Sequence, residues 1–187
     1  IIMVTILANP AYMTGKIGNG VGFDPNARAL QKISTLVNRI NLMTYDFHGA
    51  FDYSQGKGRT GFLTNLYMPN DAVGFDPKFS VDTSVQAITV KLGITPSKVA
   101  IGIPAYSRGL SGITSNYGGL FQIIPSSAAI PRGNLDQPAC AMNIAPLSAA
   151  SCSGSFTYRY IIKNMLGRGF TATTRYDNHL NVANGTT

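Results

Sequence analysis

Apolar positions in the first hundred residues alternate between short continuous segments and helical spacing. Residues 1–7 form an apolar run interrupted only by Thr5, and residues 40–44 and 99–105 are two further apolar segments. Short segments of this kind, rich in branched side chains, are typical of strands buried on both faces. The sequence therefore predicts three strands of a parallel sheet, joined by helical crossovers.

Two helices are predicted between these strands. The first begins at Asp24-Pro25, after which apolar residues recur at helical spacing as far as Val37. The second is capped by Ser80 and ends at Gly93. Its apolar residues fall on one helical face: Val81, Val85, Ile88 and Leu92.

The pattern changes after Arg108. Residues 109–154 are rich in Gly, Ser, Pro and Ala and show little periodicity. Residues 156–166 then predict a helix that ends at Gly167, and residues 169–176 alternate as in an exposed or antiparallel strand. We interpret the chain as an α/β core over residues 1–107, followed by a small α+β insertion over residues 108–187.

Composition limits the partners that this chain can have. It has 187 residues, enough for one domain with a core, and no apolar run approaches the roughly 18 residues that span a bilayer. The net charge is +7, but the basic residues are scattered and are not interleaved with aromatic residues. We therefore expect neither a membrane nor a nucleic-acid partner.

The acidic residues are all Asp, because the chain has no Glu, and it also has no Trp. This excludes any mechanism that takes a catalytic Glu from this chain. The first residue is Ile1, already inside a predicted strand, so we expect the chain to be cut from a longer protein at both ends.

Cys140 and Cys152 are the only cysteines and can close a short ring. A disulfide there would contribute roughly 3 kcal/mol through loop closure and indicates an oxidising compartment. The chain is then secreted, extracellular or periplasmic; the alternative is two reduced thiols in a cytosolic loop. The histidines, His48 and His179, have no ligand spacing with the cysteines, so we expect no metal and no cofactor.

Reactive side chains follow two of the predicted strands. Met43, Tyr45 and Asp46 lie at the end of the second strand, and Tyr106 and Arg108 follow the third. In parallel α/β barrels, the active site is built from side chains at the carboxyl ends of the strands. These five residues are therefore the candidate site.

Two motifs in these segments resemble a known family. MTYDFHG, at residues 43–49, resembles the sixth-strand Met-x-Tyr-Asp-x-x-Gly motif of glycoside hydrolase family 18, the chitinases. GIPAYSRG, at residues 102–109, resembles its seventh-strand Gly-x-Pro-x-Tyr-x-Arg motif. The resemblance covers nearly the whole chain. It implies a partial (β/α)8 TIM barrel, about strands five to seven, followed by the α+β insertion domain of that family.

The resemblance also implies an activity, which is retaining, substrate-assisted hydrolysis of β-1,4-linked N-acetylglucosamine. Tyr45 would donate a hydrogen bond to the acetamido group that attacks the anomeric carbon, and Asp46 would hold the same sugar. Met43, Tyr106 and Arg108 would bind substrate, with Met43 packed under the sugar. The partner would be chitin or a chito-oligosaccharide.

The chain departs from the family pattern in two places. The fourth-strand Asp-x-x-Asp-x-Asp-x-Glu motif, which supplies the acid, and the eighth-strand Trp are absent from it. We therefore expect this chain alone to be inactive and to require the N-terminal half of the barrel and its eighth strand. Three parallel strands would leave sheet edges and apolar surface open, so we also expect it to be unstable alone.

Three alternatives remain open at this point. The parent protein could be a non-catalytic, chitinase-like lectin that binds chito-oligosaccharides. The chain could also be an unrelated doubly wound α/β protein, with a phosphate site in the glycine-rich residues 15–22. Single residues could have structural roles: Tyr45 and Asp46 as a hydrogen-bonded pair, Arg108 as an ion-pair partner of Asp46, and His48 as a loop residue.

The aromatic residues of the insertion have two readings. They could wall a sugar groove, because sugars stack on aromatic faces, or they could pack a core. The residues are Tyr117, Phe121, Tyr158 and Tyr160.

Overall fold

A computed structural model describes residues 1–13, 29–55, 58–68, 80–114, 116–143 and 150–169. The chain divides into two compact units. Unit 1 comprises Ile1–Tyr45 and Thr64–Ile103, with Asp177–Thr187, and unit 2 comprises Asp46–Leu63 and Pro104–Tyr176. The domain boundary expected between residues 107 and 108 stays a prediction.

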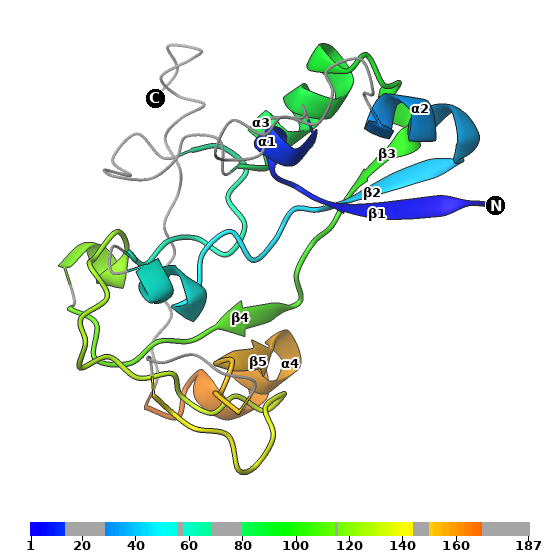
Figure 1. The fold of residues 1–187 in the computed structure, drawn as a ribbon. Coiled ribbons are helices and arrows are strands. Elements are labelled where there is room, and N and C mark those ends of the chain that lie inside the picture. The colour runs from blue at the N-terminus through cyan, green and yellow to red at the C-terminus, as the bar shows by residue number, and fades with distance from the viewer. Residues whose placement is uncertain (14–28, 56–57, 69–79, 115, 144–149, 170–187) are drawn as a thin grey trace. The chain divides into compact units, whose positions relative to one another are not determined.

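Unit 1 is built on a parallel sheet of three strands in the order β1-β2-β3 (Figure 1). The strands are β1 (Met3–Leu7), β2 (Arg39–Met43) and β3 (Val99–Ile101). All three predicted strands are thereby confirmed. The third is shorter than expected: the backbone amide of Gly102 still donates to the carbonyl of Leu42, and the chain leaves the sheet after this bond.

The helices of unit 1 are α1 (Pro10–Met13), α2 (Ala29–Leu36) and α3 (Val81–Gln86). α3 continues as a π-helical turn over Ala87–Lys91. A 3-10 turn, Pro96–Lys98, leads into β3.

The predicted start of α3 is confirmed, since the Ser80 hydroxyl accepts from the amide of Thr83 at 3.2 Å. Its predicted end is confirmed at Gly93, where φ is 68°. The predicted helix start at Asp24-Pro25 lies outside the described residues.

The core of unit 1 lies between the sheet and its helices. Ile40 and Leu42 of β2 and Ile88 of the α3 continuation are at most 1% exposed. The outer strand is different, because Met3 and Leu7 are more than half exposed. Unit 1 thus buries its central strand and leaves apolar side chains of β1 in water.

Unit 2 contains a two-stranded antiparallel sheet of β4 (Tyr106–Arg108) and β5 (Ser155–Thr157). The helix that follows is α4 (Tyr158–Tyr160), which continues as a wider turn over Ile161–Met165. Two 3-10 turns, Ala50–Gln55 and Asn116–Gly119, complete the unit. The predicted helix over residues 156–166 was wrong at its start, because residues 156 and 157 pair with β4 and Thr157 caps the helix. The predicted strand over residues 169–176 lies outside the described residues from residue 170 onward.

A small core and a disulfide bond hold unit 2 together. One cluster of buried residues in this core consists of Ala50, Ile124, Ala128, Ile130 and Cys152. Cys152 is bonded to Cys140 in a disulfide with a Cα–Cα distance of 4.9 Å. The aromatic residues of the insertion divide, since Phe121 is buried whereas Tyr158 is 65% exposed.

In the described part of the chain, the helices are all too short or too polar to cross a bilayer.

Candidate active site

Asp46 is the centre of the candidate site in unit 2. It follows the second strand and takes a φ of 57°, in the left-handed region that Asp adopts more readily than most residues. The Tyr106 hydroxyl, from β4, donates to Asp46 Oδ1 at 2.9 Å. The strained backbone and the hydrogen bond together fix the orientation of this carboxylate.

Arg108 donates hydrogen bonds to the same carboxylate from two of its nitrogens. Its Nε donates to Asp46 Oδ1 at 2.9 Å and its Nη2 donates to Oδ2 at 2.8 Å. Bidentate pairs of this kind combine charge with a fixed planar geometry. The guanidinium carbon also lies 5.4 Å from the centre of the Tyr106 ring, within cation–π range. The structure thus brings Asp46, Tyr106 and Arg108 together, and they are half-buried.

These contacts decide the charge of Asp46. Burial is the largest single influence on its pKa and raises it, but the hydrogen bonds from Arg108 and Tyr106, together with the positive charge of Arg108, outweigh burial. The pKa of Asp46 therefore lies below its ordinary value of 3.8. The hydrogen bond to Asp46 in turn raises the pKa of Arg108. At neutral pH the pair is a carboxylate and a guanidinium.

A cavity of about 490 Å³ adjoins Arg108 within unit 2. His48, Thr60, Leu110 and Ile113 are among its lining residues, so its wall combines polar and apolar groups. His48 Nδ1 lies 3.1 Å from Asp52 Oδ2. The cavity is large enough to take part of a small polar ligand.

Met43 and Tyr45 belong to unit 1. Met43 ends β2, opposite Leu7 of β1, and is partly buried. The Tyr45 ring lies directly against Gly102, where an added Cβ would be 2.5 Å from Tyr45 Cε1. A side chain at the first glycine of the GIPAYSRG motif would therefore displace the tyrosine ring from this position.

A cluster around the disulfide has donor atoms at metal-binding separation. Asp136, Cys140 and Cys152 each place one such atom within 4.8 Å of the others. Both sulfurs are bonded in the disulfide, so neither is the thiolate that a metal would need.

Sequence reasoning missed two residues of this region. Ser155 accepts a hydrogen bond from Arg108 Nη1 at 2.8 Å, and no motif marks this serine. Asp52 pairs with His48, and here the spacing of four residues was a usable signal.

The chemistry of the site favours a neutral, hydroxyl-rich or amide-bearing ligand. A carboxylate offers acceptor lone pairs, whereas the phenol and guanidinium beside it offer donors. Because Arg108 neutralises Asp46, the pair has no net charge that would select a strongly ionic ligand.

Comparison with known proteins identifies the family. The family model of glycosyl hydrolases family 18 matches residues 2–184, and the chain belongs to this family. Chitinase A of Pseudoalteromonas piscicida is 27% identical over 175 residues, which is 84% of this chain and 19% of that protein. The chain spans about a fifth of the length of this relative and of the probable chitinase 2 of Drosophila melanogaster.

Solved structures show the fold. Chitinase ChiA74 from Bacillus thuringiensis superposes with a TM-score of 0.70 at 22% identity, over 94% of this chain and 24% of that chain. A mutant class V chitinase from Nicotiana tobaccum in complex with NAG4 gives a TM-score of 0.51 at 20% identity, over 86% of this chain and 36% of that one. With the family, these likenesses place the chain in a fold of TIM-barrel type.

Proposed function

We propose that this chain is the part of a chitinase that binds the N-acetylglucosamine units of chitin or chito-oligosaccharides. The observation that carries the proposal is the pairing of Asp46 with Arg108 and Tyr106, which come from the two family motifs. Other proteins support the proposal, because the relatives found by sequence and the neighbours found by structure are chitinases. One of these structures is a complex with NAG4.

The proposed reaction is retaining hydrolysis assisted by the substrate. The acetamido oxygen of the sugar attacks the anomeric carbon while the glycosidic bond from that carbon to the leaving oxygen breaks, and a general acid protonates the leaving oxygen. The positively charged oxazolinium ion that forms is then opened by water. Tyr45 donates a hydrogen bond to the acetamido group and so steadies it for attack. Asp46 supplies a fixed negative charge that stabilises the developing positive charge.

Asp46 is ionised at neutral pH, as its lowered pKa favours, and this charge determines which role the residue takes. An ionised carboxylate can accept hydrogen bonds and stabilise a cation, but it has no proton to give to the leaving oxygen. The general acid of the proposed reaction is therefore a different group. Because the sequence has no Glu, we place a glutamic acid of that role outside this chain.

The remaining site residues are proposed to bind substrate. Arg108 and Tyr106 hold Asp46 and offer further donors to sugar hydroxyls, and Met43 provides an apolar surface beneath the sugar ring. Sugar rings have apolar faces, so a thioether can pack against one of them.

We propose that the three strands of unit 1 are strands five to seven of the barrel, and that the chain continues into the α+β insertion of the family. The partner surface is the rest of the barrel. Support comes from the apolar side chains that unit 1 leaves in water: Met3 is 56%, Leu7 58% and Ile103 83% exposed. Covering such side chains contributes about 25 cal/mol for each Å² of apolar surface.

We also propose that the protein is secreted or periplasmic. The disulfide between Cys140 and Cys152 supports this, because such bonds persist mainly in oxidising compartments. Cell fractionation tests it: the protein should be recovered outside the cytosol, and recovery in the cytosol alone would contradict the proposal.

The function is tested on the full-length protein that carries this chain. Hydrolysis of a fluorogenic chitotrioside is compared between the wild type and an Asp46→Asn variant. We expect kcat/KM to fall about 100-fold, since a charge aimed at the transition state is lost. Asp82→Asn is the matched control, because Asp82 is an acidic residue in the first turn of α3, on the other unit.

Calorimetric titration with chitohexaose separates the remaining outcomes. Binding together with hydrolysis is the expected result. Binding without any hydrolysis would replace the enzyme with a chitinase-like lectin, and the absence of both would overturn the proposed function.

A further inference from the structure

We propose that Ser155 is a positioning residue, which acts through Arg108 to hold the Asp46 carboxylate in its binding geometry. The proposal rests on the proposed function, because it concerns the same site. Ser155 belongs to no family motif that the sequence displays, and it lies 47 residues from Arg108 along the chain.

The first step is the contact between the two side chains. Two nitrogens of Arg108, Nε and Nη2, donate to Asp46, and the third, Nη1, donates to Ser155 Oγ at 2.8 Å. A planar guanidinium held at all three nitrogens cannot turn without breaking a hydrogen bond. The Ser155 hydroxyl therefore restrains the one guanidinium nitrogen of Arg108 that does not bind Asp46.

The second step is that Ser155 is itself fixed. It stands opposite Arg108 in the β4–β5 pair and is 5% exposed. Its carbonyl accepts from the amide of Leu135 at 3.2 Å. At Gly133, an added Cβ would lie 1.9 Å from the Ser155 carbonyl oxygen, so only glycine allows this loop to pack against the strand.

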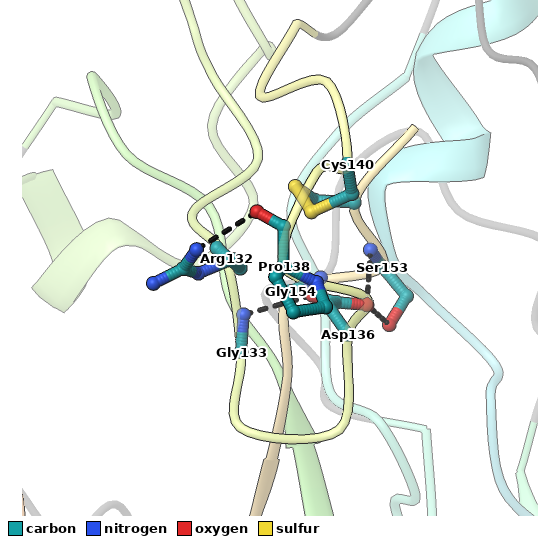
Figure 2. Close-up of a disulfide and its surroundings, with 8 residues drawn as sticks. Arg132, Gly133, Asp136, Pro138, Cys140, Ser153 and Gly154 are labelled. Atoms are coloured by element: carbon teal, nitrogen blue, oxygen red, sulfur yellow. Dashed lines mark hydrogen bonds between the residues drawn. A yellow bond between two sulfur atoms is a disulfide. The ribbon is translucent and has the colours of Figure 1, made fainter. Parts of the chain in front are cut away.

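The third step is the clasp around Asp136, formed by Gly133, Asp136, Ser153 and Gly154 (Figure 2). Asp136 Oδ1 accepts from the Ser153 amide at 2.8 Å and from the Ser153 hydroxyl. Its Oδ2 accepts from the amides of Gly133 at 2.8 Å and Gly154 at 3.1 Å. The clasp thus ties together the two segments that meet at Ser155, one residue after Gly154.

The disulfide reinforces the same loop. Cys152 immediately precedes the clasp residue Ser153, and Figure 2 shows the bond beside the Asp136 hydrogen bonds. The disulfide and Asp136 therefore hold Ser155 in place, Ser155 holds Arg108, and Arg108 holds Asp46. Each of these residues belongs to unit 2.

The test compares Ser155→Ala, Ser155→Thr and Ser111→Ala in the full-length protein. Ser155→Ala removes the acceptor, and Ser155→Thr keeps a hydroxyl. Ser111→Ala is the matched control, because it removes an exposed serine hydroxyl of the same unit, whose partner is the carbonyl of Ala129. Two quantities are measured: kcat/KM on a chito-oligosaccharide, and the pKa of Asp46 from the NMR shift of its carboxyl carbon.

We expect Ser155→Ala to lower kcat/KM about 10-fold, the kinetic equivalent of one hydrogen bond to a charged group. The pKa of Asp46 should rise toward its ordinary value, because a mobile guanidinium stabilises the carboxylate less. Ser155→Thr should restore both quantities, and Ser111→Ala should change neither. A Ser155→Ala protein with lower stability but an unchanged Asp46 pKa would reduce Ser155 to a structural residue and overturn the proposal.

Two further results keep this proposal separate from the proposed function. If the wild type neither binds nor cleaves chito-oligosaccharide, the proposed function fails, and the Asp46 titration still decides whether Ser155 positions Arg108. If Ser155→Ala does not fold, the wild type alone is informative. Rotation about the Cζ–Nη1 bond of Arg108 should be slower by NMR than in the exposed Arg159, and equal rates would contradict the proposal.

Discussion

The two units position their functional side chains by different means. In unit 1, Tyr45 follows a buried apolar strand, and its ring rests on Gly102. In unit 2, Asp46 is held by charged hydrogen bonds from Arg108 and Tyr106, and the loop behind them is tied by a disulfide. Burial and periodicity shape the first unit, whereas polar bonds and a covalent link shape the second. Changes to apolar residues should therefore act on unit 1, and changes to polar groups on unit 2.

The largest expected effect is on the core of unit 1. Leu42→Ala removes a side chain that is 1% exposed in the central strand. It should lower the free energy of unfolding of unit 1 by about 2–5 kcal/mol through lost burial and a cavity. Hydrogen exchange read by mass spectrometry on the full-length protein resolves the two units.

The control for this change is Leu36→Ala, at the end of α2, where the side chain is 75% exposed. It should alter exchange little, since it leaves no cavity. Equal effects of the two changes would contradict the view that the central strand carries the core of unit 1.

The second effect concerns the disulfide of unit 2. A double variant, Cys140→Ala with Cys152→Ala, should lower the stability of that unit by about 3 kcal/mol, as expected for a short closed loop. Exchange should rise around residues 133–155 and stay unchanged in the sheet of unit 1. An equal increase of hydrogen exchange in the sheet of unit 1 would contradict the view that the disulfide stabilises unit 2 alone.

Acid should act on unit 2 through two carboxylates. The pKa of Asp46 is lowered as described, and that of Asp136 is also lowered, because four hydrogen bonds together outweigh the opposing effect of burial. A lowered folded-state pKa gives stability that is fully present above the unfolded value, about 3.9, and is lost as the pH falls through the folded value. The protection of unit 2 against hydrogen exchange, corrected for the pH dependence of the intrinsic exchange rate, should therefore be constant above about pH 5 and decrease below about pH 4.

The control for the acid experiment is an Asp136→Asn variant. It should lose part of the acid sensitivity and should already be less stable at neutral pH, because an amide NH2 would face backbone donors. An acid response of unit 2 that is the same with and without Asp136 would contradict the assignment.

The smallest expected effect is at the start of α3. Ser80→Ala removes the hydroxyl that accepts from the amide of Thr83. It should lower the free energy of unfolding of unit 1 by about 1 kcal/mol. Ser97→Ala, at an exposed serine of the same unit, is the control and should cost less than half of that. An equal cost would mean that the cap does not determine where this helix begins.

The same contrast explains what the sequence could predict. The strands of unit 1 and the limits of α3 followed from apolar spacing and from Ser80 and Gly93, since these signals are local. Unit 2 depends on contacts between distant residues, such as Arg108 with Ser155, which leave no periodic trace. The start of the helix after residue 157 was missed for this reason, because pairing of residues 156 and 157 with β4 overrode the helical pattern.

The candidate site shows the same division. The motifs pointed to Asp46, Tyr106 and Arg108, and the structure brings these three together. They gave no indication of Ser155 or of the Asp136 clasp, because neither residue belongs to a motif or to a periodic pattern in the sequence. Roles in catalysis and substrate binding for the five predicted residues, Met43, Tyr45, Asp46, Tyr106 and Arg108, stay predictions until activity is measured.

The most direct test follows the first product of the reaction by proton NMR. Chitohexaose is incubated with the full-length protein, and the anomeric signals of the new reducing ends are recorded within the first minutes. A retaining, substrate-assisted chitinase should release the β-anomer first, with the α-anomer appearing later by mutarotation. Release of the α-anomer first, or no new reducing ends at all, would contradict the account.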